Sequence, residues 1–173
     1  MYDISDIASR RVAVVGQGYV GLPVAIRAVE VGFDVVGFDT DKTRIDCLRK
    51  AETFIDDITD GDLATAMSTG RYLPTDDSAA LAGFDVAVVC VPTPLRDGAP
   101  DLSYIEDAAA ILAAHITPGC CIILESTSYP GTPEGDCLPI LRAGTGRRAG
   151  PGFLAGDSPA RRRRGTGASG VQQ

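Results

Sequence analysis

The sequence has few residues of the kinds that hold metals or form redox centres. It contains one histidine, His115, and five cysteines, none of which belongs to a Cys-x-x-Cys pair. Cys90, Cys120 and Cys121 fall inside apolar runs, where a free cysteine packs as a small hydrophobic residue. These features argue against a metal or redox centre and predict reduced, buried cysteines and a structural histidine at the end of a helix.

Long apolar runs are also missing. No segment approaches the roughly 18 apolar residues that a membrane-spanning helix requires. The first residues, MYDISDIASRR, include two aspartates and no apolar core, unlike a secretory signal peptide. The sequence therefore predicts a cytoplasmic protein without a membrane partner.

Basic residues are in the minority and unevenly placed. Sixteen lysines and arginines against 23 aspartates and glutamates give a net charge of −7 over 173 residues, a length that suits one domain. Every acidic residue precedes Ser158, whereas four consecutive arginines, Arg161–Arg164, follow it. An acidic body of this kind argues against binding of nucleic acid over a broad surface.

Short apolar runs alternate with helical patterns along the chain. The runs are rich in valine and isoleucine without polar alternation, as in parallel strands covered on both faces. They span Arg11–Gly16, Asp34–Asp39, Asp85–Val91 and Cys120–Glu125, with a further candidate at Gly152–Gly156. The helical patterns span Val20–Val31, Asp41–Lys50, Asp60–Gly70, Asp101–Ile116 and Thr132–Leu141. The alternation predicts an α/β fold with a Rossmann-like, doubly wound parallel sheet, in which Asp60 and Asp101 are expected to cap their helices.

A glycine motif follows the first predicted strand. Gly16, Gly18 and Gly21 form the pattern Gly-x-Gly-x-x-Gly at the start of a helix, which is the context that a dinucleotide-binding turn requires. Gly16 permits the tight turn, Gly18 lets a pyrophosphate approach the backbone, and Gly21 lets the helix pack close to the strand. The helix N-terminus then offers its N–H groups to the anion. The alternative is that these glycines only form a turn.

An acidic residue ends the second predicted strand. Asp39 lies 18 residues after Gly21, where a carboxylate can accept hydrogen bonds from the adenosine ribose of a dinucleotide. The same carboxylate would repel the 2′-phosphate of NADP, so the sequence favours NAD. Lys42 and Arg44 are close enough in the sequence to weaken that preference.

Two later segments are expected at the same edge of the sheet. CVPTPL contains Pro92, which would stiffen the loop, and Thr93, which offers a hydroxyl to the cofactor. LESTSYPGT places Glu125, Ser126 and Thr127 after the next strand. Ligands of doubly wound sheets bind outside the carboxyl ends of the strands, so both segments are candidate contacts. The alternative is that their serines and threonines only cap the strand ends.

Four segments together resemble the UDP-glucose/GDP-mannose dehydrogenase family. They are VAVVGQGYVGLPVAIRAVEVGFDVVGFDTD, FIDDITDGDL, CVPTPLRDGAPDLSYIEDA and LESTSYPGTPEG, and they occur in the family's order between about Val12 and Pro159. Within the family, the sequence is most similar to the bacterial UDP-N-acetylhexosamine 6-dehydrogenases. Several motifs in order are far more specific than the glycine pattern alone.

The resemblance implies an NAD-dependent enzyme that oxidises the C6 alcohol of a UDP-sugar to the carboxylate with two NAD. In the family, a cysteine of the C-terminal half forms a thiohemiacetal, and a helix beyond the position of Arg161 forms most of the homodimer interface. Carried over by motif position, the residues expected to bind the cofactor are Gly16, Gly18, Tyr19, Val20, Gly21, Asp39, Arg44, Pro92, Thr93 and Thr127.

The end of the chain departs from the family pattern. Ala160 stands where the family has a glutamate that takes part in the chemistry, and none of the five cysteines lies in the family's nucleophile motif. We therefore expect an NAD-binding domain over residues 1–157 and a disordered, Gly- and Arg-rich tail over residues 158–173. A frameshift or truncation, a genuine disordered end, or an anion-binding patch at Arg161–Arg164 would each account for the tail.

Three functions are open at this point. The first is the NAD-binding half of a nucleotide-sugar 6-dehydrogenase, inactive alone and able to act on a UDP-sugar only with a second domain. The second is a retained non-catalytic module that binds NAD or a partner protein. The third is a different NAD-dependent hydroxyacid dehydrogenase, although the segments YIEDA and STSYPGT favour the sugar enzymes.

Overall fold

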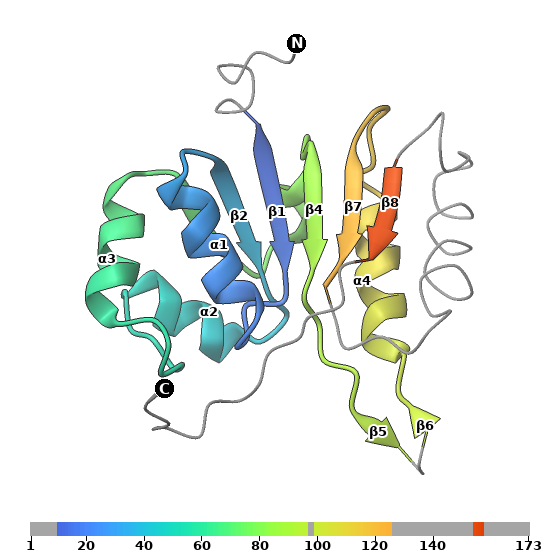
Figure 1. Cartoon of the computed structure of the whole chain (residues 1–173), viewed down its shortest axis with the longest axis horizontal. Helices are drawn as coiled ribbons and strands as arrows, with labels where there is room; N and C mark the ends of the chain where they lie inside the picture. Colours follow the sequence, from blue (N-terminus) through green and yellow to red (C-terminus); the bar gives the residue numbers. More distant parts are fainter. Residues whose placement is uncertain (1–9, 97–98, 126–153, 158–173) are drawn as a thin grey trace, which may run out of the picture.

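A computed structural model of the chain describes residues 10–96, 99–125 and 154–157 (Figure 1). Six parallel strands form the central sheet in the spatial order β3-β2-β1-β4-β7-β8. In chain order they are β1 (Arg11–Val15), β2 (Asp34–Phe38), β3 (Tyr72–Thr75), β4 (Val86–Val89), β7 (Cys121–Leu124) and β8 (Leu154–Asp157). The helices are α1 (Gly21–Glu30), α2 (Lys42–Arg49), α3 (Asp60–Ser68), the short 3-10 helix η2 (Ser78–Leu81) and α4 (Ser103–Ala113).

The sheet is doubly wound, as the alternation of strands and helices predicts. β1 pairs with β2 on one side and with β4 on the other, so the order of the strands reverses at β1. Such a reversal opens a crevice outside the carboxyl ends of the two diverging strands, where ligands of this class of fold bind. A small antiparallel pair, β5 (Leu95–Arg96) with β6 (Ala99–Pro100), projects beyond the same end of β4 (Figure 1).

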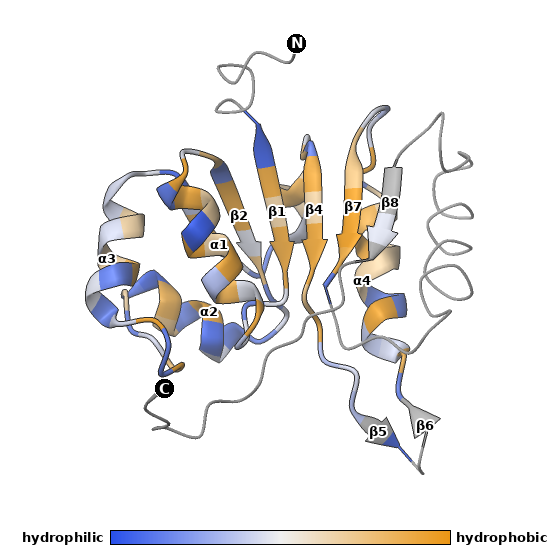
Figure 2. Ribbon diagram, in the orientation of Figure 1, coloured by the Kyte–Doolittle hydropathy of each residue, from blue (hydrophilic) through white to orange (hydrophobic). Residues whose placement is uncertain are grey.

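Both faces of the sheet are covered, which explains the uninterrupted apolar runs. Alternate residues of β1 enter two separate cores, because successive side chains of a strand point to opposite faces. Val12 and Val14 pack with Leu22 of α1 and with α2 and α3, whereas Ala13 and Val15 pack with α4 and η2. The ribbons of the central strands are accordingly hydrophobic along most of their length (Figure 2).

The strand predictions are confirmed, but β3 of the central sheet and the short pair β5 and β6 were not predicted. The four apolar runs form β1, β2, β4 and β7, and the candidate at Gly152–Gly156 corresponds to β8. β3 escaped notice because it is short and lies at the edge of the sheet, where Leu73 is half exposed and Pro74 is tolerated. The predicted helix at Thr132–Leu141 and the predicted tail over residues 158–173 lie outside the described residues.

The expected N-caps of two helices are wrong by one position each. Thr59, and not Asp60, caps α3: its hydroxyl accepts from the backbone N–H of Asp62 (3.1 Å), whose carboxylate accepts from the N–H of Thr59 (3.0 Å). This reciprocal pair is a capping box, and it satisfies two backbone donors that Asp60 could not reach together. Asp60 instead accepts from the N–H of Thr53 at 2.7 Å.

The start of α4 shows a similar shift. Its N-cap position is Leu102, and Asp101 lies one residue earlier than expected for a cap. The carboxylate of Asp101 still accepts from the backbone N–H of Ser103 (3.1 Å) and from its hydroxyl (2.6 Å). The residue type at this helix start was therefore informative, although its position was not.

Candidate functional site

The turn between β1 and α1 depends on the special geometry of Gly16. Its φ angle is +92°, in the region that favours glycine, and its N–H donates to the carbonyl of Phe38 at 2.8 Å. A Cβ at this position would lie 2.7 Å from the carbonyl oxygen of Cys90. Gly16 therefore serves both the turn and the close approach of the end of β4.

The other two glycines of the motif differ in what surrounds them. A Cβ on Gly21 would lie 1.7 Å from the carbonyl oxygen of Gly16, so only glycine lets α1 start this close to the strand. At Gly18, no atom of the described residues lies within 4 Å of such a Cβ. The roles expected for Gly16 and Gly21 thus have a steric basis, and the space beside Gly18 gives a ligand access to the backbone.

The N-terminus of α1 is suited to an anion. Within the described part of the chain, no side chain caps this helix at Val20 and no acidic residue lies in its first turn. In contrast, Asp41 caps α2 and Thr59 caps α3. An uncapped helix N-terminus offers backbone donors and a partial positive charge. The uncapped end and the open space beside Gly18 fit the pyrophosphate of a dinucleotide.

Asp39 is buried just beyond β2 and is held by three donors. Its Oδ2 accepts from the backbone N–H of Gln17 (2.7 Å) and from Nη1 of Arg44 (2.8 Å). Its Oδ1 accepts from the backbone N–H of Asp41 at 2.9 Å. A carboxylate has about four acceptor directions, so this fixed group can still accept a further hydrogen bond from a ribose hydroxyl.

The two cations that follow Asp39 in the sequence have different surroundings. Arg44 is about two-thirds shielded (34% exposed), pairs with Asp39, and places its guanidinium 5.3 Å from the ring centroid of Phe54. Lys42 is largely exposed, with Nζ 4.0 Å from a carboxylate oxygen of Asp76. Arg44 is therefore the cation that is part of the Asp39 site.

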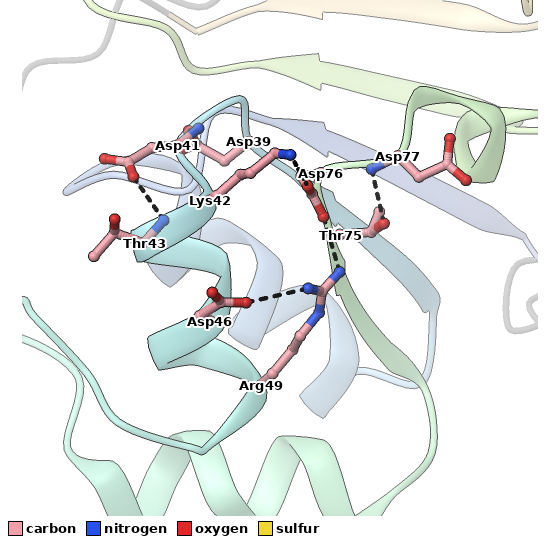
Figure 3. A network of polar contacts seen from close by, with 9 residues as sticks. All are labelled: Asp39, Asp41, Lys42, Thr43, Asp46, Arg49, Thr75, Asp76 and Asp77. Atoms are coloured by element: carbon pink, nitrogen blue, oxygen red, sulfur yellow. Dashed lines mark hydrogen bonds and ion pairs between the residues drawn. The ribbon is translucent and has the colours of Figure 1, made fainter.

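A polar network ties α2 to the end of β3 (Figure 3). Arg49 donates to Asp46 (3.3 Å) and to Asp76 (3.0 Å), and the N-cap Asp41 accepts from the N–H of Thr43 (3.0 Å). The pKa of Asp76 is below its ordinary value, first because its own backbone N–H donates to it and then because Arg49 does. These contacts position the β2–α2 turn, which carries the buried carboxylate of the site.

The loop after β4 meets the glycine turn. The N–H of Cys90 donates to the carbonyl of Val15 at 2.7 Å, and the carbonyl of Cys90 lies against Gly16. Beyond it, Pro92 is exposed and Thr93 is half buried. The structure thus brings Pro92 and Thr93 to the edge that holds the glycine motif, as predicted from their position after a strand.

The remaining predicted contacts are placed only in part. Tyr19 is 59% exposed at the glycine turn, and the partly buried Val20 packs against the core beneath α1. Thr127 lies outside the described residues. The preceding strand end is described as far as Glu125, whose N–H donates to the carbonyl of Val89 at 2.8 Å.

One residue of the site was missed by sequence reasoning. Gln17 occupies the variable position between the first two glycines, yet it is completely buried and its side chain bonds to Tyr72 of β3. The glycine motif assigns no role to this position. The only signal in the sequence was a polar residue in a turn that is expected to be buried.

The described residues contain no cluster of three or more histidine, cysteine or acidic side chains that could hold a metal ion. Cys90 and Cys120 are buried, as predicted, and the described cysteines form no disulfide. Cys47 and Cys121 are partly exposed, and Cys137 lies outside the described residues. Among the described helices, none is long and apolar enough to cross a membrane.

Two dehydrogenases are similar to this chain in sequence. UDP-N-acetyl-D-mannosamine dehydrogenase of Pyrococcus horikoshii is 38% identical over 155 residues, which are 87% of this chain and 36% of that protein. UDP-N-acetyl-D-glucosamine 6-dehydrogenase of Pseudomonas aeruginosa is 40% identical over 154 residues, 87% of this chain and 35% of that protein. The chain therefore spans little more than a third of the length of these relatives.

Solved structures share the fold. The UDP-D-ManNAc dehydrogenase of Pyrococcus horikoshii superimposes with a TM-score of 0.84 at 38% identity, over 88% of this chain and 37% of that one. A ternary complex of GDP-mannose dehydrogenase from Pseudomonas aeruginosa gives 0.83 at 30% identity, over 88% of this chain and 36% of that one. Lactate dehydrogenase of Eimeria maxima, at 16% identity and a TM-score of 0.57, shares the fold alone.

The family model of the UDP-glucose/GDP-mannose dehydrogenase NAD-binding domain matches residues 10–170. The match runs past Pro159, where the resemblance was expected to end, and covers most of the chain. It agrees with the glycine turn, the uncapped α1 and the buried Asp39, and it makes NAD the cofactor of this domain. The chain belongs to the UDP-glucose/GDP-mannose dehydrogenase family and carries that family's NAD-binding domain.

Proposed function

We propose that this chain holds NAD for the oxidation of a nucleotide sugar. The observation that carries the proposal is the meeting of three features at one sheet edge: open space beside Gly18, the uncapped N-terminus of α1, and the fixed carboxylate of Asp39. The pyrophosphate of NAD would lie on the first two and the adenosine ribose on Asp39.

Further contacts follow from the same placement. Arg44 would hold Asp39 in place, and Tyr19 and Val20 would border the pyrophosphate from the glycine turn. Pro92 and Thr93, after β4, would lie toward the other half of the cofactor, together with Thr127 as implied by the family resemblance. When bound, NAD supplies the acceptor for a hydride; the residues of the chain bind it and orient it.

The substrate is proposed from the relatives. Those named above act on UDP-N-acetyl-D-mannosamine and UDP-N-acetyl-D-glucosamine, so the proposed reaction is oxidation of the C6 alcohol of such a sugar to the carboxylate. The family resemblance implies a nucleophilic cysteine in the C-terminal half of the whole enzyme. Burial, and then the charge of Glu125, raises the pKa of the Cys90 thiol to about 12, which is the opposite of an activated nucleophile.

We therefore propose that the 173-residue chain alone binds NAD and turns over no sugar. A UDP-sugar would be oxidised only with a second domain, in a cytoplasmic homodimer and without a role for nucleic acid. The boundary at residue 157 and the disordered tail stay predictions.

The test is NADH formation by the purified chain with UDP-N-acetylglucosamine or its manno epimer, measured by absorbance. We expect no turnover by a chain that binds NAD. Sustained NADH formation by the chain alone would overturn the assignment of the nucleophile to another part of the protein.

A further inference from the structure

Gln17 is a polar residue in a place where a side chain of its type is uncommon. Its exposed fraction is 0%, although glutamine is usually found at protein surfaces. Room for it is made by Gly37 of β2, where a Cβ would lie 2.7 Å from Oε1 of Gln17 and 2.8 Å from the ring of Tyr72. The φ angle of Gly37 is not positive, so the backbone conformation does not require glycine there. Glycine is required because a side chain would occupy the space of Gln17 and Tyr72.

The polar groups of Gln17 connect it to β3, to β1 and to the residue that follows β2. Its Oε1 accepts from the hydroxyl of Tyr72 on β3 (2.7 Å), and its Nε2 donates to the carbonyl of Val14 on β1 (2.8 Å). Its backbone N–H donates to Oδ2 of Asp39, just beyond β2, at 2.7 Å. One residue thus connects the glycine turn to the carboxylate that faces the ribose.

The Tyr72 hydroxyl is suited to donate permanently. Burial, and to a lesser extent the charge of Asp39, raises its pKa above the ordinary value, so the hydroxyl stays protonated over the working range of the protein. The side-chain oxygen Oε1 of Gln17 is buried as well, and leaving a buried acceptor without a donor costs free energy. The orientation of Gln17 is therefore tied to Tyr72.

We propose that Gln17 and Tyr72 are positioning residues of the cofactor site. Their buried hydrogen bond holds the peptide of Gln17 in the orientation in which its N–H fixes Asp39, and so sharpens the preference for the ribose hydroxyl of NAD over the 2′-phosphate of NADP. This inference rests on the proposed placement of the adenosine ribose at Asp39.

The test is a comparison of NAD and NADP affinities by calorimetry on the full chain. Tyr72→Phe removes the donor and keeps the ring, and we expect NAD to bind about tenfold more weakly while NADP changes less, so that the affinity ratio falls. Tyr104→Phe, at a half-exposed tyrosine on α4, is the matched control and should leave the ratio unchanged.

A double variant separates positioning from stability. In Gln17→Met/Tyr72→Phe the amide oxygen and the hydroxyl are both replaced by apolar groups of similar size, and only the carbonyl of Val14 loses a side-chain donor. The melting temperature should therefore recover part of the way from Tyr72→Phe toward that of the unaltered chain. The affinity ratio should stay low, because no side-chain hydrogen bond holds the peptide of residue 17 in this variant. An unchanged ratio in both variants would overturn the proposal. If the unaltered chain binds no NAD, the proposed function fails and this inference with it; if it binds and only the ratio is insensitive, the inference alone fails.

Discussion

Arg44 and Asp39 form a 2.8 Å ion pair in which the arginine contacts both a carboxylate and an aromatic ring. Asp39 is buried, Arg44 is 34% exposed, and the guanidinium lies 5.3 Å from the centroid of Phe54. A planar guanidinium can donate to the carboxylate from its edge while its face lies over the ring, a geometry that the compact ammonium group of lysine does not reproduce. The ion pair fixes the Asp39 carboxylate and partly neutralises its charge before the ribose binds.

Loss of this arginine should weaken cofactor binding without abolishing it. We expect Arg44→Ala to raise the Kd for NAD about fivefold, equivalent to ~1 kcal/mol, because the pair is partly screened by solvent. Arg44→Lys should recover only part of the loss, since it keeps the charge and loses the stacking on Phe54. Arg27→Ala, which breaks an exposed pair with Glu30, is the control. An unchanged Kd in Arg44→Ala would show that the pair has no role in binding.

The glycines of the turn should separate folding from binding. Gly18→Ala adds a Cβ where the described residues leave open space, so the chain should fold with a nearly unchanged melting temperature and bind NAD at least about tenfold more weakly. Gly21→Ala places a Cβ 1.7 Å from a carbonyl oxygen and should destabilise the fold by ~2 kcal/mol or more. Thermal unfolding and calorimetry check the pair. Normal NAD affinity in a folded Gly18→Ala chain would contradict the placement of the pyrophosphate.

The capping box of α3 should make stability depend on pH. The pKa of Asp62 is lowered by the hydrogen bond from the side chain of Thr59 and then by that from its backbone N–H. A lowered pKa in the folded state means that the contribution is complete above the ordinary value of 3.8 and is lost as the pH falls through the folded pKa.

The measurement is thermal unfolding between pH 7 and pH 3 of the unaltered chain and of Asp62→Asn. The difference in melting temperature should be largest near neutral pH and should shrink below about pH 4. Asp56→Asn, at an exposed carboxyl in the loop before α3, is the control. If the difference in melting temperature stays constant across this pH range, the ionised Asp62 carboxylate does not stabilise α3 through the capping box.

The cysteines should differ in reactivity. With a pKa of about 12, Cys90 is thiolate in roughly one molecule in ten thousand at pH 8, and it is also buried. Iodoacetamide should therefore label the partly exposed Cys47 much faster than Cys90 in the folded chain, and both should react in denaturant. Peptide mass spectrometry distinguishes the sites. Equal rates in the folded chain would show that the interior beside the glycine turn is open to solvent.

The parts of the fold that could be predicted are those in which local chemistry and tertiary packing agree. The run at Arg11–Val15 is apolar because both faces of β1 are covered, and Gly16 and Gly21 are required by sterics within the turn itself. β3 could not be predicted, because an edge strand needs little apolar sequence and its pairing with β2 is a long-range contact. The cap at Thr59 was missed because the adjacent Asp60 is an equally good capping residue by type.

The same distinction applies to the site. Asp39 could be predicted because a residue at the end of a strand faces the ligand edge in any doubly wound sheet. The hydrogen bond between Gln17 and Tyr72 joins positions 55 residues apart, and no short-range sequence pattern pairs them. Gly37, which makes room for both, resembles an ordinary strand position until the side chains of Gln17 and Tyr72 are seen beside it.

The most direct test of the account is a calorimetric titration of the 173-residue chain with NAD, beside Asp39→Ala and the control Asp56→Asn. Asp56 is exposed in the loop before α3 and lies outside both the proposed site and the polar network of α2. The account predicts saturable binding by the unaltered chain and by the control, and binding at least about tenfold weaker in Asp39→Ala. A folded chain that binds no NAD, or binds it equally well without the Asp39 carboxylate, would contradict the central claim.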